Sequence, residues 1–272
     1  MERPYTLGFV GGGNMAEGIV AGLLNSGRCA ADRIIVSDPL PERRALFDRR
    51  FGVSTTEDNR EAVRQADTLV LAVKPQTFGD LASELGACLR DDQLIVSIMA
   101  GWSSKSVAEA LGGGTIRVVR VMPNLPIRVG TGVAGICAGD HATPDDVVRV
   151  KGIFDAAGQS VVIEREDLMD AVTAVSGSGP AYFYYVTEAI IAGGVAAGLD
   201  REQAVQLAKN TCLGAARMMV ETGFEPAELR RQVTSRGGTT QAAIEMMDWA
   251  GVSEAIRLAV QVAARRSKEL GK

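Results

Sequence analysis

The chain has 272 residues, of which 46% are hydrophobic and 23% charged, and its formal net charge is −4 at pH 7. This composition is typical of a globular protein with enough apolar material for two modest domains or one large one. Its Lys and Arg residues are dispersed, which argues against a nucleic-acid partner, because polyanion binding needs a concentrated basic face.

The four cysteines are widely separated, and no Cys-X-X-Cys pair or adjacent histidine suggests a metal site or a disulfide framework. We therefore predict reduced core thiols and no bound metal at Cys29, Cys88, Cys137 and Cys212. The first residues lack the charged-then-apolar pattern of an export signal, so a cytoplasmic location is expected.

The chain begins with a strand pattern at residues 6–10, followed by three glycines and apolar residues at helical spacing. Gly11, Gly13 and Ala16 fit the pattern G-X-G-X-X-A. In it the first Gly permits the turn, the second allows a pyrophosphate to approach the backbone, and the small third residue packs helix on strand. The helix N-terminus would then face the phosphates. A dinucleotide site is predicted here, and an ordinary strand-to-helix turn is the alternative.

A second strand at residues 33–37 leads to Asp38, at about the distance from the glycines where a dinucleotide site recognises the adenosine ribose. An acid there accepts hydrogen bonds from the 2′-hydroxyl and repels a 2′-phosphate, which favours NAD. Arg43 and Arg44 open the next helix and could reach a 2′-phosphate if Asp38 turns away. The sequence therefore leaves NAD and NADP open, and a plain turn is also compatible with Ser37-Asp38-Pro39.

Further strands are expected at residues 68–73, 94–98, 116–121, 132–138 and 160–163, most of them separated by helical stretches. This alternation predicts an α/β fold, a Rossmann-type doubly wound sheet with right-handed crossovers. Ligands bind such sheets at the carboxyl ends of the strands, where Lys74-Pro75-Gln76 follows one strand. The loop at residues 122–126, stiffened by two prolines, either lines a pocket or is a connector.

The only histidine, His141, lies in a polar loop before a helix that starts near Thr143 and Pro144. No orienting partner for its imidazole is visible in the sequence. We therefore expect it to be exposed and to take no part in proton transfer.

From Glu164 onward the strand pattern stops, and helices are expected at residues 167–176, 180–197, 201–222, 226–233, 240–250 and 252–270. This change places a domain boundary near residue 165, between a dinucleotide-binding domain at 1–165 and an all-helical domain at 166–272. The apolar segment at 171–199 is broken by Ser-Gly-Ser-Gly-Pro and carries Glu188. It favours a helix buried in a core or against another subunit over a membrane span.

Two stretches of this helical half are unusual. In residues 171–182 a helical run is interrupted by small polar residues and Pro, which allows close approach of a backbone or ligand. In residues 233–240 a glycine pair flanked by hydroxyls precedes a helix, so the N–H groups of Gly238, Thr239 and Thr240 could converge on a carboxylate. The alternatives are a kinked core helix and an N-capped turn.

Together with the glycine turn and Ala72-Val73-Lys74-Pro75-Gln76, these stretches resemble the pyrroline-5-carboxylate reductase family, and the resemblance runs from Leu7 to about Leu270. Its most specific parts are residues 170–182 and 233–240. The family pattern has Pro where this chain has Arg236, and relatives often have a small or amide residue at the position of Asp38.

The resemblance implies reduction of 1-pyrroline-5-carboxylate to L-proline with NADP(H) or NAD(H). It also implies an all-helical dimerisation domain and an intertwined homodimer, or a higher oligomer built from it, with each site shared between subunits. By resemblance, the cofactor contacts are Gly11, Gly12, Gly13, Asn14, Met15, Ala16, Ser37, Asp38, Asn59, Ala72, Val73, Lys74, Pro75, Ile98, Met99 and Ala100. The substrate positions are Glu166, Ser235, Gly238, Thr239 and Thr240, with the Thr240 hydroxyl as proton donor.

This chemistry suits a chain with one histidine, because a protonated iminium accepts hydride without a strong acid and a hydroxyl or water suffices. A β-hydroxyacid-dehydrogenase-like oxidoreductase is one alternative, but it needs a lysine base near the domain boundary. No lysine lies between Glu166 and Gln206. A non-catalytic dinucleotide-sensing protein is another, and the presence of both unusual stretches speaks against it.

Overall fold

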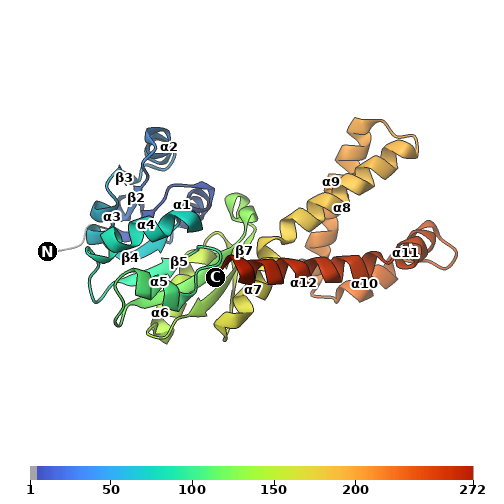
Figure 1. Cartoon of the computed structure of the whole chain (residues 1–272). Coiled ribbons are helices and arrows are strands. Elements are labelled where there is room, and N and C mark those ends of the chain that lie inside the picture. Colours follow the sequence, from blue (N-terminus) through green and yellow to red (C-terminus); the bar gives the residue numbers. More distant parts are fainter. Residues whose placement is uncertain (1–4, 272) are drawn as a thin grey trace. The chain divides into compact units, whose positions relative to one another are not determined.

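The computed structural model describes residues 5–271. The chain forms two compact units (Figure 1). The first holds the chain up to Ser178 and again from Ala263, and the second is Gly179–Val262. The short helices that follow residue 165 therefore lie in the same compact unit as the sheet, and the predicted division of the chain at residue 165 stays a prediction.

An eight-stranded sheet forms the centre of the first unit, in the order β3-β2-β1-β4-β5-β6-β7-β8. Its strands are β1 Tyr5–Val10, β2 Ile34–Ser37, β3 Ser54–Thr56, β4 Ala66–Leu71, β5 Leu94–Ser97, β6 Arg117–Pro123, β7 Gly132–Ala138 and β8 Gly158–Val162. Neighbouring strands are parallel except β6 and β7. The sheet confirms the predicted Rossmann-type fold.

Two features of the sheet differ from the sequence analysis. The strand β3 was not expected, because its three residues are Ser and Thr without an apolar run. The antiparallel pairing of β6 with β7 follows from their connection, which contains only the short helix η2 Leu125–Val129. A parallel crossover needs a dozen or more residues, so the chain turns back instead.

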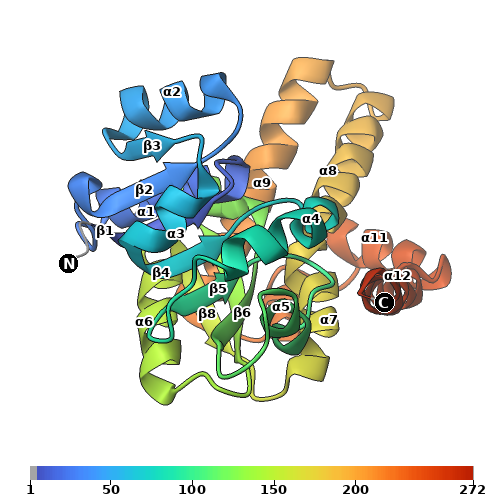
Figure 2. The ribbon, with the colours of Figure 1, turned by 60° about the vertical axis from the view of Figure 1, so that its left-hand side comes forward.

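Helices cover both faces of the sheet (Figure 2). The helices of this unit are α1 Asn14–Asn25, η1 Ala31–Arg33, α2 Pro41–Phe51, α3 Asn59–Gln65, α4 Pro75–Gly86, α5 Ser104–Ala110, α6 Pro144–Asp155, η3 Glu166–Leu168, α7 Met169–Val172 and the π-helix η4 Thr173–Gly177. Side chains of α1, α2 and α6 pack on one face and those of α3, α4 and α5 on the other. The helix α6 starts where expected, and His141 before it is exposed.

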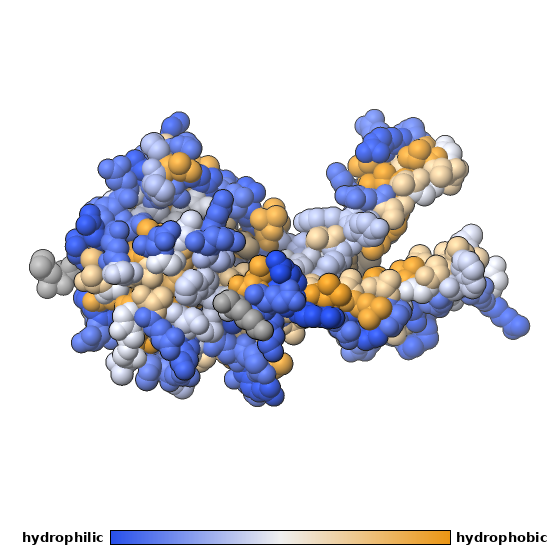
Figure 3. Space-filling model, in the orientation of Figure 1, coloured by the Kyte–Doolittle hydropathy of each residue, from blue (hydrophilic) through white to orange (hydrophobic). Residues whose placement is uncertain are grey.

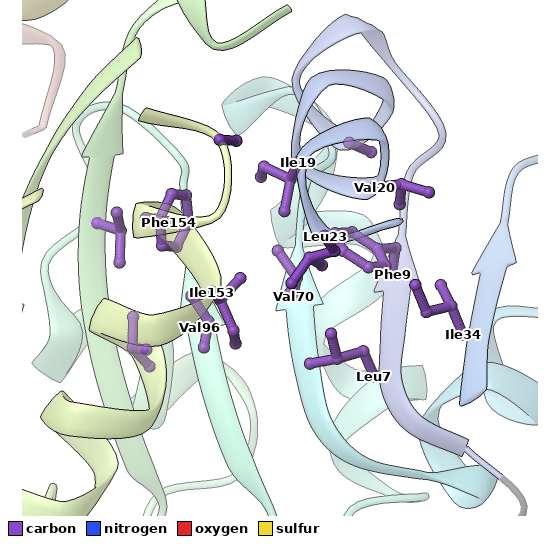
Figure 4. Packing of buried hydrophobic residues seen from close by; sticks show 14 of the residues in the cluster. Leu7, Phe9, Ile19, Val20, Leu23, Ile34, Val70, Val96, Ile153 and Phe154 are labelled. Atoms are coloured by element: carbon purple, nitrogen blue, oxygen red, sulfur yellow. The ribbon is translucent and has the colours of Figure 1, made fainter. Parts of the chain in front are cut away.

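One hydrophobic core lies between the middle of the sheet and the helices α1 and α6 (Figure 4). Phe9 on β1 and Val70 on β4 are fully buried, together with Ile19 on α1 and Phe154 on α6. Full burial of side chains of this size stabilises the fold by roughly 1.5–3 kcal/mol each. The turn between β1 and α1 is therefore fixed at both ends by packed elements.

The second unit contains α8 Gly179–Ala196, α9 Arg201–Thr222, α10 Pro226–Gln232, α11 Thr239–Trp249 and the first part of α12 Val252–Leu270. Several large side chains of α8 are exposed, among them Phe183, Tyr185 and Ile190. Figure 3 shows apolar residues, in orange, on the surface of the helical part of the chain. Of the two alternatives expected for this segment, a core of its own chain or another subunit, this exposure argues against the first. No helix in the described part of the chain is long and apolar enough to cross a membrane.

The four cysteines carry free thiols, and only Cys137 is buried. The prediction of core thiols is therefore correct for Cys137, whereas Cys29 and Cys88 are partly exposed and pack against the core from its rim. Cys212 is also partly exposed and belongs to neither core cluster. Burial raises the pKa of the Cys137 thiol, and the nearby Glu166 carboxylate adds to this effect. Within residues 5–271, no cluster of His, Cys, Asp and Glu residues could hold a metal ion.

Candidate functional site

The turn between β1 and α1 needs glycine at its first position. Gly11 has a φ of +99°, a region that side chains rarely adopt, and an added Cβ would lie 2.7 Å from the Ala72 carbonyl oxygen. The Gly11 N–H donates to the Ser37 carbonyl at 2.9 Å, which ties the turn to β2. The predicted role of this glycine as the residue that permits the turn agrees with its geometry.

Gly13 leaves the start of α1 open to a ligand. It is the N-cap of α1, and a Cβ added there would meet no atom within 4 Å. Among the described residues no side chain caps this helix end. The first N–H groups of a helix lack partners within the helix, and the dipole makes this end positive. An open backbone and an uncapped helix end are what a pyrophosphate group needs.

The other predicted cofactor positions gather at the same edge of the sheet. Strands β2, β1, β4 and β5 are neighbours, and each ends next to one predicted segment. The Ala72 N–H donates to the Val10 carbonyl at 2.8 Å, and the Ile98 N–H donates to the Leu71 carbonyl at 3.2 Å. The structure therefore brings together the segments 11–16, 37–38, 72–75 and 98–100, all in the first unit.

The end of β2 and the start of α3 lie on the side of this site nearest β3. They carry Ser37, Asp38 and Asn59. The Ser37 hydroxyl donates to Asn59 Oδ1 at 2.8 Å, which links the end of β2 to the first residue of α3. The Asp38 carboxylate accepts the Gly12 N–H at 2.8 Å and the Leu40 N–H at 2.9 Å. The glycine cradle and this fixed end fit a dinucleotide with its adenosine ribose near Asp38.

Glu166 lies in the first unit, where both of its carboxylate oxygens are engaged. Oε1 accepts the Ser104 N–H at 2.6 Å, and Oε2 accepts the Ser104 hydroxyl at 2.5 Å. The buried Arg120 guanidinium on β6 lies 3.3 Å from Oε1. The carboxylate thus joins the start of α5, the strand β6 and the helix η3.

The interrupted helical stretch contains a π-turn rather than a simple kink. The Ser178 N–H donates to the Thr173 carbonyl at 2.8 Å, five residues earlier, and the Ser176 hydroxyl donates to the Val172 carbonyl at 2.9 Å. The Ser176 bond is of the kind expected for hydroxyls at a helix break. Single π-turns inside helices occur frequently at functional sites.

Asn124, which the sequence analysis did not single out, holds this π-turn. Its amide nitrogen donates to the Ser176 carbonyl at 3.1 Å, and its amide oxygen accepts the Val133 N–H at 2.9 Å. One signal in the sequence could have indicated this role: Asn124 lies in a loop between two prolines, and its side-chain amide can donate and accept hydrogen bonds at the same time. Of the two interpretations of the loop at 122–126, these bonds favour a connector that positions its neighbours.

The second unit carries the remaining predicted residues at the start of α11. Gly238 is the N-cap, and no side chain in the described residues caps this helix. A Cβ at Gly238 would overlap the Ser235 Oγ, so the absence of a side chain lets the Ser235 hydroxyl lie against the turn. The Gly238 N–H already donates to the Ser235 carbonyl at 3.0 Å. The Gly238 N–H is therefore already engaged, and the open N–H groups at this helix start are those of Thr239, Thr240 and Gln241.

The predicted residues fall into two groups, one in each unit. The cofactor positions and Glu166 lie in the first, and Ser235, Gly238, Thr239 and Thr240 lie in the second. Thr240 is partly buried, whereas Thr239 and Arg236 are exposed. Chemically, the first group offers a dinucleotide cradle, and the second offers helix N–H groups and a hydroxyl for a small carboxylate.

Comparison with known proteins gives consistent matches over the whole chain. A family model described as pyrroline-5-carboxylate reductase dimerisation matches residues 166–270, and one described as NADP oxidoreductase, coenzyme F420-dependent, matches residues 6–101. The pyrroline-5-carboxylate reductase of Methanosarcina acetivorans is 42% identical over 98% of this chain and 98% of its own.

Two solved structures resemble this one closely. A pyrroline-5-carboxylate reductase from Coxiella burnetii has a TM-score of 0.92 at 36% identity, over 99% of both chains. The pyrroline carboxylate reductase of Plasmodium falciparum, solved with NADP bound, has a TM-score of 0.87 at 28% identity, over 100% of both chains.

Proposed function

Because the chain belongs to the pyrroline-5-carboxylate reductase family, we propose that it reduces 1-pyrroline-5-carboxylate to L-proline with a nicotinamide dinucleotide, and so serves proline biosynthesis. The observation that carries the proposal is the Gly11 turn against Ala72 beside the uncapped start of α1. Joined to family membership, this cradle makes a dinucleotide-dependent reductase the best-supported function.

When bound, the dinucleotide supplies the hydride that the imine carbon accepts. In the proposal, residues 11–16 hold its pyrophosphate, and Ser37, Asp38 and Asn59 hold the adenosine ribose end. The segments 72–75 and 98–100 line the end where the reactive ring lies, because they leave the neighbouring strands β4 and β5 at the same edge. The chain thereby fixes one reactant and leaves one face of it for substrate.

The start of α11 is proposed to bind the substrate. The N–H groups of Thr239 and Thr240 receive the carboxylate, since an uncapped helix start favours an anion. The Thr240 hydroxyl donates a hydrogen bond and the proton to the ring nitrogen, and regains a proton from water. Gly238 allows Ser235 to pack against the turn, which keeps these groups in place.

A homodimer completes the proposal. The exposed apolar residues of α8 need a cover, and the family model that spans residues 166–270 is described as a dimerisation domain. Each site would combine the dinucleotide unit of one subunit with the α11 start of its partner, and larger oligomers would be built from such dimers. The free thiols suit a reducing compartment, so a cytoplasmic location belongs to the same proposal.

The test is an assay with 1-pyrroline-5-carboxylate and reduced cofactor, run separately with NADH and NADPH, in which L-proline is identified by chromatography. Cofactor oxidation with matching formation of L-proline supports the function. Tight dinucleotide binding without turnover would instead identify a non-catalytic dinucleotide-sensing protein. Oxidation of a β-hydroxyacid, and no reduction of the imine, would identify the neighbouring dehydrogenase class.

A further inference from the structure

We propose that Asp38 makes this enzyme select NADH over NADPH. The inference rests on the proposed function only in that the glycine cradle binds a nicotinamide dinucleotide. It depends on the position of the Asp38 carboxylate and on the contacts that already engage the two neighbouring arginines.

The Asp38 carboxylate is fixed at the end of β2, where it is 9% exposed. Asp38 Oδ2 accepts a hydrogen bond from the Gly12 N–H at 2.8 Å, and Oδ1 accepts one from the Leu40 N–H at 2.9 Å. The backbone N–H of Asp38 donates to the Thr56 carbonyl at 3.1 Å. A carboxylate offers about four lone-pair sites, so two remain for ribose hydroxyls. A phosphate at the same place would meet a buried negative charge.

Gly12 and Asp38 hold each other in place. A Cβ added to Gly12 would lie 3.3 Å from Asp38 Oδ2, so the absence of a side chain lets the carboxylate sit against the cradle. Turning Asp38 away would leave the Gly12 and Leu40 N–H groups without acceptors, and an unpaired polar group is costly when little water reaches it. The carboxylate therefore stays where it excludes the 2′-phosphate.

The arginines that could attract a 2′-phosphate are engaged elsewhere. Arg43 Nε donates to the Gly12 carbonyl at 2.6 Å, and its Nη2 lies 3.1 Å from Glu17 Oε2. Arg44 Nη1 donates to the Asp38 carbonyl at 2.8 Å, and its Nη2 lies 3.2 Å from Glu57. Both guanidiniums thus brace the cradle and α2, and the N–H groups that make these contacts, Arg43 Nε and Arg44 Nη1 among them, are not free for a phosphate.

The experiment is isothermal titration calorimetry of NADH and NADPH into the wild type and into Asp38→Ser. We expect the wild type to bind NADH at least about tenfold more tightly than NADPH, which is the effect of one like-charge contact that is well screened by water. Asp38→Ser should remove most of this preference, mainly by tightening NADPH. If the serine variant fails to fold, Asp38→Asn replaces it in the same titrations. The asparagine removes the negative charge but keeps one side-chain oxygen that can accept a backbone N–H.

Three control variants separate this effect from general charge and from the arginines. Asp48→Ser removes an exposed acid on α2, the helix that carries Arg43 and Arg44, and should leave the ratio of the two dissociation constants unchanged. Arg43→Ala and Arg44→Ala should not weaken NADPH selectively. A tenfold weaker NADPH affinity in either arginine variant, with NADH unaffected, would overturn the proposal.

The outcomes also separate this inference from the proposed function. Reduction of the imine with equal affinity for both cofactors would overturn the selectivity alone. A preference for NADH that depends on Asp38, without formation of L-proline, would support the selectivity and contradict the proposed function. Wild-type protein that binds NADPH more tightly than NADH would overturn the inference directly.

Discussion

Replacing Glu166 is expected to destabilise the first unit more than it weakens substrate binding. Its carboxylate accepts two hydrogen bonds from Ser104 and pairs with Arg120, whose side chain is only 10% exposed. Removing one partner of a buried pair costs about 3–5 kcal/mol. Water softens this cost because the Glu166 side chain is 24% exposed, so Glu166→Ala should lower the free energy of unfolding by roughly 2–3 kcal/mol.

The assay is urea denaturation followed by far-UV circular dichroism, with Glu166→Gln as the matched variant of similar shape. A double-mutant cycle with Arg120→Met should show a coupling energy of about 1 kcal/mol or more, because the two side chains are in contact. The substrate KM of folded Glu166→Gln should change by less than roughly threefold if the carboxylate only positions Arg120 and Ser104. Wild-type stability with a KM raised tenfold would show that Glu166 touches the substrate, as the family resemblance implies.

Three further predictions concern the turns and one helix cap. Thr240→Ala should lower kcat by roughly a hundredfold while the dinucleotide Kd stays within about twofold, and Thr240→Ser should restore most of the rate; unchanged turnover would exclude the hydroxyl from proton transfer. Gly11→Ala should abolish dinucleotide binding in calorimetry, because a left-handed backbone costs about 1–2 kcal/mol and the new Cβ would lie 2.7 Å from the Ala72 carbonyl oxygen; an unaltered Kd would contradict this. Burial alone would raise the pKa of Asp146, but its capping hydrogen bonds and the Arg117 guanidinium outweigh burial and hold that pKa below its usual value. The stabilisation by Asp146 is therefore present above the ordinary carboxyl pKa and is lost as the pH falls through the lower folded value. Asp146→Asn should cost about 1 kcal/mol at neutral pH and less in acid, and a difference in unfolding free energy that does not vary with pH would be inconsistent with this reasoning.

The dinucleotide half could be predicted because its signals are local. The turn at Gly11 follows from one strand, one positive φ and one helix, all within a short stretch of chain. The strand β3 gave no such signal, since Ser54, Thr55 and Thr56 form a short polar edge strand next to β2 alone. The antiparallel β7 could have been anticipated from the short loop before it, because chain length alone forbids a parallel crossover there.

The contacts that hold the site together could not be predicted in the same way. Glu166 and Ser104 are 62 residues apart in sequence, and Asn124 and Ser176 are 52 apart. Neither pair has a spacing related to a helix or strand period, so no local pattern brings them together. The family resemblance assigns Glu166 to the substrate because it matches a position that holds the substrate in relatives. Its partners in the fold suggest that it positions the start of α5 instead.

The helix α8 shows where a single sequence stops being informative. A helix that is apolar on all sides has no preferred face, so its pattern predicts burial without saying what covers it. The structure shows that the rest of the same chain does not cover this part of α8, because Phe183 and Tyr185 are exposed, Tyr185 by 75%. Burial of each such side chain is worth roughly 1.5–3 kcal/mol, and a second copy of the helical unit would gain that free energy twice, once on each subunit. In the proposed dimer, what covers α8 is therefore a second chain, and the sequence of one chain carries no pattern that identifies such a contact.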